Sequence, residues 1–193
     1  MDNQESESTI MAQGKPGSGR SFALLLLLVL IGSIGFGVFL RQFIRPSTSS
    51  TGLIGKPAPA INVETWLNGP GPSAEDLRGK VIVVDAWAHW CGPCRAHAPE
   101  LVALHKQYSP RGVVFVGLTH IDEPDEVGKS RRFLEATGIS WPNGYGADQT
   151  LQALKADLIP QRWVIDSHNI IVWDETSHET IESAIDLALK AIP

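Results

Sequence analysis

Apolar residues gather in two uninterrupted runs that predict the centre of a sheet. Residues 81–87 and 113–119 are almost wholly apolar and rich in valine, which is typical of strands buried on both faces. The segment between them, 93–108, is interpreted as a helix, so the two strands are expected to be parallel and joined by a crossover. The pattern therefore predicts an α/β domain.

Beyond the second strand, the pattern changes to amphipathic segments. It predicts helices at 125–137 and 149–156, with a loop at 139–146 between them. Trp141 and Tyr145 lie in that loop. These aromatic residues either line a groove for a partner protein or pack beneath the loop.

The last part of the chain predicts a hairpin and a final helix. Residues 162–166 and 170–174 alternate in polarity around a turn and are expected to pair antiparallel. Thr176 and Glu179 form a capping box that is expected to begin the last helix. Apolar residues recur on one face of that helix: Ile181, Ile185, Ala188, Leu189 and Ile192. The complete order predicts a mixed central sheet with helices on both faces.

The N-terminal part has a different character. Residues 1–21 are polar and lack periodicity, which predicts a disordered tail. Residues 22–40 form a run of 19 uncharged, mostly aliphatic residues, and a helix of that length spans roughly 30 Å, the thickness of a bilayer's hydrocarbon core. Residues 41–52 are rich in polar and turn-forming residues and predict a linker. The globular domain is expected to occupy residues 53–193.

The apolar run 22–40 is interpreted as a single-pass transmembrane helix that anchors the chain in the lipid bilayer. The alternative is a cleaved signal peptide, but the run is longer than a typical signal core. It is followed by Arg41, Gln42 and Arg45 instead of a small-residue cleavage site. Positive charges on its two sides nearly balance, so they do not set the orientation.

Charge narrows the range of partners. The chain of 193 residues carries a formal net charge of −5 and contains no basic run. A nucleic-acid partner is therefore not expected.

The chemistry centres on Cys91 and Cys94, the only two cysteines. The first buried strand and a short turn deliver Cys91 to a helix start, where unpaired amides and the helix dipole favour a thiolate. A thiolate is the nucleophile of disulfide exchange, and Cys94, one turn later, is placed to close an intramolecular disulfide. Asp85 is an anomalous acid within the apolar strand. If it is buried, its carboxyl group can exchange a proton with Cys94.

Other interpretations use the same residues. The cysteine pair can be half of a zinc site, with histidines as the remaining ligands, or a purely structural disulfide. His89, His97 and His105 lie near the pair in sequence but are expected on a solvated face, and His120 is either a neighbour of the site or a solvated loop residue.

The run from Asp85 to Arg95 resembles the active-site signature of the thioredoxin superfamily, with Ala86 where an aromatic residue is common. Pro99 also stands where that superfamily kinks its active-site helix. The resemblance implies a thioredoxin fold in which Cys91 is the nucleophile, Cys94 resolves, Asp85 moves the proton and Trp90 shields the pair. It requires no metal and no organic cofactor.

The segment from Leu53 to the active-site strand is similar to the TlpA/ResA branch of the superfamily. Those proteins are membrane-tethered, extracytoplasmic oxidoreductases with an added N-terminal β-hairpin, and the similarity implies both features here. It also implies a cis peptide before Pro160, opposite the cysteines. Leu158 and Gln161 depart from the glycine and threonine that are common beside that proline. The residues expected to contact substrate are Trp90, Gly92, Pro93, Ile159 and Pro160.

The resemblance implies a protein-disulfide reductase, because Gly-Pro is the dipeptide between the cysteines of the reducing thioredoxins. Its expected substrates are disulfides of exported proteins, such as the haem-attachment cysteines of apocytochrome c on the periplasmic side. A membrane electron-donor protein has to supply the reducing equivalents, because the outside is oxidising. The alternatives are a disulfide oxidase or isomerase and, in another class, a copper-binding chaperone module in which a histidine such as His120 completes the ligands.

Overall fold

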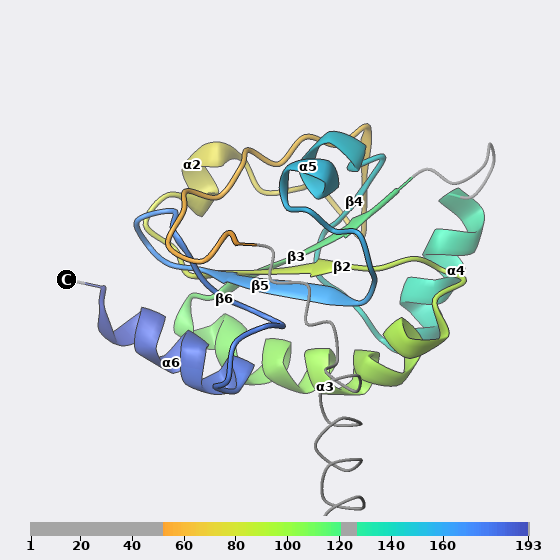
Figure 1. The fold of residues 1–193 in the computed structure, drawn as a ribbon. Coiled ribbons are helices and arrows are strands. Elements are labelled where there is room, and N and C mark those ends of the chain that lie inside the picture. The colour runs from red at the N-terminus through yellow and green to blue at the C-terminus, as the bar shows by residue number, and fades with distance from the viewer. Residues whose placement is uncertain (1–51, 121–126, 193) are drawn as a thin grey trace, which may run out of the picture. The chain divides into compact units, whose positions relative to one another are not determined.

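The protein, seen as a computed structural model, is described over residues 52–120 and 127–192, which form a six-stranded mixed sheet flanked by helices (Figure 1). The strands are β1 Thr65–Leu67, β2 Ile82–Ala86, β3 Val114–Thr119, β4 Asn143–Tyr145, β5 Gln161–Ile165 and β6 Ile171–Asp174. The helices are α2 Ala74–Leu77, α3 Gly92–Tyr108, α4 Val127–Thr137, α5 Asp148–Ala153 and α6 Ile181–Lys190, with a 3₁₀ turn, η1, at Ser109–Arg111. The predicted α/β architecture is confirmed.

The anchor, the tail and nearly all of the linker predicted for the N-terminal part lie outside the described residues. Within residues 52–120 and 127–192, no helix has the length and apolar character needed to cross a bilayer.

Strand β2 lies near the centre of the sheet, whose order is β1-β4-β3-β2-β5-β6. It pairs in parallel with β3, as the crossover through α3 requires, and antiparallel with β5. The predicted hairpin of β5 and β6 is also confirmed. The end of β2 is therefore held on both sides, which fixes the residues that follow it.

Each face of the sheet buries its own apolar core. The core on the side of α3, α4 and α6 includes Val81, Val83, Trp87, Leu101, Leu104, Phe133 and Ile185. The core on the opposite side, beneath α5, includes Ile82, Val84, Ala86, Val116, Leu118, Leu151 and Trp163. Alternate residues of β2 point to opposite cores, and this explains why the whole strand is apolar apart from Asp85.

The prediction of an N-terminal β-hairpin is wrong. The backbone of Gly55 and Lys56 bonds to Ile171 at one edge of the sheet, whereas β1 pairs with β4 at the other edge. The segment between them therefore crosses the α5 face (Figure 1). Its apolar residues Ala58, Ile61 and Val63 pack on the core there. They are therefore shielded from water by a face of the sheet and not by a second strand of a hairpin.

Two local predictions are also corrected. The expected loop at 139–146 contains β4, and Trp141 and Tyr145 are buried, so they pack beneath this segment. Helix α6 is capped by Thr180, whose hydroxyl accepts a hydrogen bond from the Ser183 amide. Thr176 does not take part in the expected capping box, because its hydroxyl donates to Asp174 instead.

Gly117 permits a close contact between β3 and β4. An alanine Cβ there would lie 1.7 Å from Oδ1 of Asn143, the atom that accepts a 2.8 Å hydrogen bond from the indole of Trp87. Gly117→Ala is therefore expected to lower the free energy of unfolding by about 1–3 kcal/mol. Urea denaturation measures this loss.

Gly128→Ala is the matched control, because a Cβ at this α4 position meets only the end of the Arg132 side chain, at 3.6 Å. It is expected to stabilise the protein by about 0.5–1 kcal/mol, as alanine does in helices. Equal stability of the two variants would contradict this account of the β3–β4 contact.

Candidate active site

The active-site turn follows directly from β2. Trp87 and Ala88 continue the buried strand, and the Trp87 amide still bonds to the Leu118 carbonyl of β3. The chain then turns, with the Cys91 amide donating to the carbonyl of Ala88. This short connection places Cys91 at the N-cap of α3.

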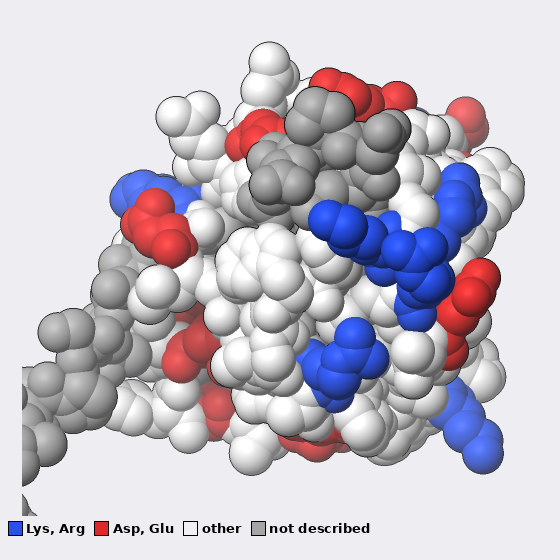
Figure 2. Space-filling view, turned by 90° about the vertical axis from the view of Figure 1, so that its right-hand side faces the viewer, with Lys and Arg blue, Asp and Glu red and all other residues white. Residues whose placement is uncertain are grey.

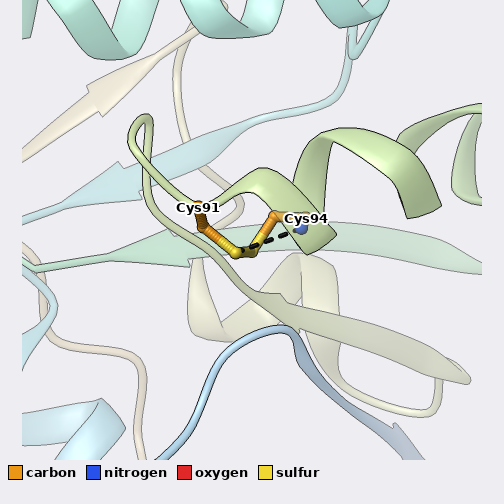
Figure 3. Close-up of a disulfide and its surroundings, with 2 residues drawn as sticks. All are labelled: Cys91 and Cys94. Carbon is orange, nitrogen blue, oxygen red and sulfur yellow. Dashed lines mark hydrogen bonds between the residues drawn. A yellow bond between two sulfur atoms is a disulfide. The ribbon is translucent and has the colours of Figure 1, made fainter.

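The two cysteines form a disulfide across the first turn of α3 (Figure 3). Their Cα atoms are 5.2 Å apart, and the Cys94 amide donates a 3.1 Å hydrogen bond to Sγ of Cys91. Both residues are almost completely buried. The Cys94 amide that donates to Sγ here is one of the helix N-terminal amides that favour a Cys91 thiolate after reduction.

Asp85 lies within the core, as the sequence predicts. Its side chain is 4% exposed, and its Oδ1 has no hydrogen-bond partner among the described residues. Burial raises the pKa of Asp85 from 3.8 to about 7, the positive charge of Arg162 opposes this rise, and Glu175 adds to it. A carboxyl group in this state can accept or release a proton near neutral pH.

Arg162 is a second buried charge, directly across the sheet from Asp85 in the β2–β5 register. Its guanidinium bonds to Glu100 of α3 through Nη1, at 2.8 Å, and to Glu175 through Nε. Burial acts to lower the pKa of Arg162, but the hydrogen bonds to the two glutamates outweigh it and raise that pKa above its ordinary value. The side chain is therefore a permanent cation beneath the active-site helix.

The predicted substrate-contacting residues lie at the ends of α3 and β5. Trp90 is 60% exposed, and Gly92 and Pro93 are also exposed. The Ile159–Pro160 peptide bond is cis, as predicted, and both residues are partly exposed just before β5 begins.

The histidines do not form a cluster. His97 is exposed, as expected, but His105 is partly buried, with its ring centroid 4.9 Å from that of Trp141, and burial lowers the pKa of His105. His120 pairs with Asp148 across 2.9 Å. Over residues 52–120 and 127–192, no group of three His, Cys, Asp or Glu residues is arranged to hold a metal ion.

Sequence analysis missed the ion network of Arg162 with Glu100 and Glu175. A signal was present, because Arg162 is the one charged residue of β5. Its partners lie 62 residues before it and 13 residues after it, and no local pattern connects positions so far apart.

Comparison with known proteins supports the interpretation of Cys91 and Cys94 as a redox-active pair. The chain is 39% identical over 126 residues to the thiol:disulfide interchange protein HelX of Rhodobacter capsulatus, covering 64% of this chain and 66% of HelX. It is 28% identical over 173 residues to the thiol-disulfide oxidoreductase ResA of Bacillus anthracis, covering 89% and 96% of the two chains. The crystal structure of the thioredoxin-like superfamily protein SPOA0173 superposes with a TM-score of 0.60 and 26% identity, over 71% of this chain and 99% of the other.

The model of the Redoxin family matches residues 53–189, which include all of the described site. These matches confirm the resemblance to the thioredoxin superfamily and its TlpA/ResA branch. With a cysteine pair at the start of α3, a buried acid in β2 and a cis proline before β5, the chain belongs to the Redoxin family and is a thiol-disulfide oxidoreductase of the ResA and HelX type.

Proposed function

We propose that this oxidoreductase is a membrane-tethered reductase of disulfides in exported proteins. The observation that carries the proposal is the Gly92-Pro93 dipeptide, which the reducing thioredoxins also have, at a helix start that favours the Cys91 thiolate. The apolar run 22–40 supports tethering to a membrane, and resemblance to the TlpA/ResA branch supports a domain on the extracytoplasmic, periplasmic side. Resemblance to the TlpA/ResA branch supports cytochrome c maturation as the pathway, with a membrane protein as the electron donor.

The proposed reaction begins with the reduced pair. The Cys91 thiolate attacks one sulfur of the substrate disulfide, forming a mixed disulfide and releasing the other sulfur as a thiolate. Asp85 takes the proton from the Cys94 thiol, and the resulting thiolate attacks Sγ of Cys91. The substrate leaves as a dithiol once its thiolates are protonated, and the enzyme keeps the Cys91–Cys94 disulfide until the electron donor reduces it.

The proposed substrate lies as an extended segment along Ile159 and Pro160, beside Cys91. Proline has no amide hydrogen, and partial exposure of both residues leaves this backbone accessible to a peptide. Trp90 and the exposed Gly92 and Pro93 contact the substrate from the other side. At the end of the molecule that carries α4 and the start of α3, the centre of the surface is uncharged, with most Lys and Arg side chains on one side of it and Asp and Glu side chains nearer the edges (Figure 2).

Trp90→Ala is expected to raise KM for a protein disulfide about 10-fold, because a large apolar contact with the substrate is lost. Leu187→Ala is the matched control: both side chains are 60% exposed, but Leu187 lies on α6, at the other end of the domain (Figure 1). Insulin reduction at varied insulin concentration measures the effect. Equal KM values for the two variants would remove Trp90 from the proposed substrate site.

One labelling experiment tests direction and location together. Intact cells that produce the protein are treated with a membrane-impermeant maleimide, and modified Cys91 and Cys94 are counted by mass spectrometry. The proposal expects both thiols to be labelled without permeabilising the cells. Labelling only after addition of a reductant would indicate an oxidase, and protection until permeabilisation would place the domain inside. The double variant Cys91→Ser/Cys94→Ser provides the blank, because the chain has no other cysteine.

A further inference from the structure

The cation beneath the active site has no explanation in stability alone. Arg162 has a side chain only 7% exposed, whereas its partners Glu100 and Glu175 are 47% and 35% exposed. Burying a guanidinium carries a large desolvation cost, and apolar residues of similar volume often serve stability equally well. We therefore expect the positive charge of Arg162 to act on a neighbouring ionisable group.

The register of β2 and β5 indicates the group on which the positive charge of Arg162 acts. Asp85 and Arg162 are directly opposed on neighbouring antiparallel strands, so their side chains share the face of the sheet that α3 covers. Facing Cα atoms in such a pair are about 4.5–5.5 Å apart. The guanidinium donates to two glutamates and not to Asp85, whose Oδ1 remains unpartnered.

The charges around Asp85 act in opposite directions. Arg162 of β5 lowers the pKa of Asp85, and Glu175, just after β6, raises it. Helix α3 contributes Glu100, which bonds to Arg162, together with the cysteine pair. On β3, the residue opposite Asp85 is the uncharged Gly117. The balance of charge that Asp85 experiences is therefore set mainly by Arg162 and Glu175.

We propose that, within the network of Glu100, Arg162 and Glu175, the ion pair of Arg162 and Glu175 is a positioning element that sets the protonation state of Asp85 and thereby the pH range in which Cys94 resolves the mixed disulfide. Arg162 favours the carboxylate that accepts the Cys94 proton, and Glu175 limits this effect so that Asp85 also releases the proton near neutral pH. This inference rests on the proposed role of Asp85 as the proton acceptor.

The resolving step can be observed directly with 5,5′-dithiobis(2-nitrobenzoate), DTNB. The reduced protein releases one coloured thiolate when Cys91 attacks the reagent and a second when Cys94 displaces the thiolate bound to Cys91. The rate of the second phase, measured from pH 5 to pH 9, reports deprotonation of Cys94. Full-length protein in detergent is used throughout.

Two substitutions that break the same ion pair are expected to shift this profile in opposite directions. Glu175→Gln leaves the positive charge of Arg162 less balanced and moves the acid limb to lower pH, by at least about half a pH unit. Arg162→Gln removes that charge and moves the limb to higher pH by at least about as much. A purely structural network would make both variants change alike, because each loses the same contact.

Glu100→Gln is the matched control. It removes a hydrogen bond to the same guanidinium, but Glu100 is not among the charges that shift Asp85, so its limb is expected to match the wild type. If Arg162→Gln does not fold, the difference between the pH profiles of Glu175→Gln and Glu100→Gln still tests the inference. Shifts of the same sign in the two network variants, or no shift in Glu175→Gln, would overturn the inference.

Asp85→Asn separates this inference from the function on which it rests. Loss of the acid limb in that variant, together with an unmoved limb in Glu175→Gln, would reject the network while keeping Asp85 as the base. Persistence of the limb in Asp85→Asn would reject the role of Asp85 itself, and the network with it.

Discussion

Cys94→Ser is expected to turn the protein into a covalent trap for its substrates. Without the Cys94 thiol, the mixed disulfide between Cys91 and the substrate cannot be resolved from within the molecule, so it accumulates. Turnover of insulin disulfides falls to the uncatalysed rate. Adducts that disappear on reduction are expected on non-reducing gels, and mass spectrometry of these adducts identifies the proteins bound through Cys91.

The paired variant Cys91→Ser fixes the direction of attack. In the disulfide, Cys91 caps α3 and its Sγ accepts the Cys94 amide, whereas Cys94 lies inside the first helical turn. Only Cys91 is therefore expected to form adducts, and Cys91→Ser is expected to be inactive without trapping substrate. Adducts formed equally by both variants would contradict the assignment of Cys91 as the nucleophile.

Asp85→Asn is expected to make the protein more stable and less active. The amide cannot accept the Cys94 proton, so the resolving step at pH 7 is expected to slow on the order of 10²-fold, a typical contribution of a general base. The DTNB second phase measures this loss. Its acid limb, which we assign to Asp85, should disappear.

The gain in stability depends on pH. Below pH 3.8 the carboxyl group is protonated in both the folded and the unfolded chain, and between 3.8 and about 7 only the unfolded chain ionises, because burial raises the pKa of Asp85 in the fold. Folding stability therefore falls as pH rises through this window, by at most about 4 kcal/mol. The advantage of Asp85→Asn is expected to be larger at pH 8 than at pH 5 by on the order of 2 kcal/mol.

Asp174→Asn provides the contrast for urea denaturation of the oxidised proteins. Asp174 is also buried, but its carboxylate accepts hydrogen bonds from the amide and hydroxyl of Thr176. Its replacement is expected to lower stability by about 1–3 kcal/mol. If Asp85→Asn were likewise destabilising at pH 8, ionisation of the buried Asp85 carboxyl group would not lower the stability as we describe.

Features that depend on neighbouring residues were predictable from the sequence. The valines around Asp85 predicted its burial, and the short turn after β2 predicted that Cys91 begins a helix. The cis bond before Pro160 followed from resemblance, because proline alone does not select cis over trans. These features place the proposed nucleophile, acid and substrate backbone at one end of β2.

Features that depend on distant pairing were not predictable. Asn143-Gly144-Tyr145 has the composition of a turn, yet it forms β4 because the exposed edge of β3 offers backbone groups that need partners. The N-terminal segment follows the same rule, since its backbone at Gly55 and Lys56 bonds to Ile171 of β6 and β1 pairs with β4 toward the opposite edge of the sheet. Arg162 was also not predicted as part of the site, because its role depends on Asp85 in the neighbouring strand and on glutamates from two other parts of the fold.

The equilibrium reduction potential of the Cys91–Cys94 pair tests the proposed direction of electron flow most directly. The purified protein is equilibrated in glutathione and dithiothreitol buffers of graded potential, and free thiols are alkylated and counted by mass spectrometry. A reductase with Gly92 and Pro93 between its cysteines is expected near about −270 mV, the value of thioredoxin. A potential well above the glutathione poise, approaching about −120 mV as in the strongest oxidant of the superfamily, would contradict the proposal and make the protein an oxidase or isomerase.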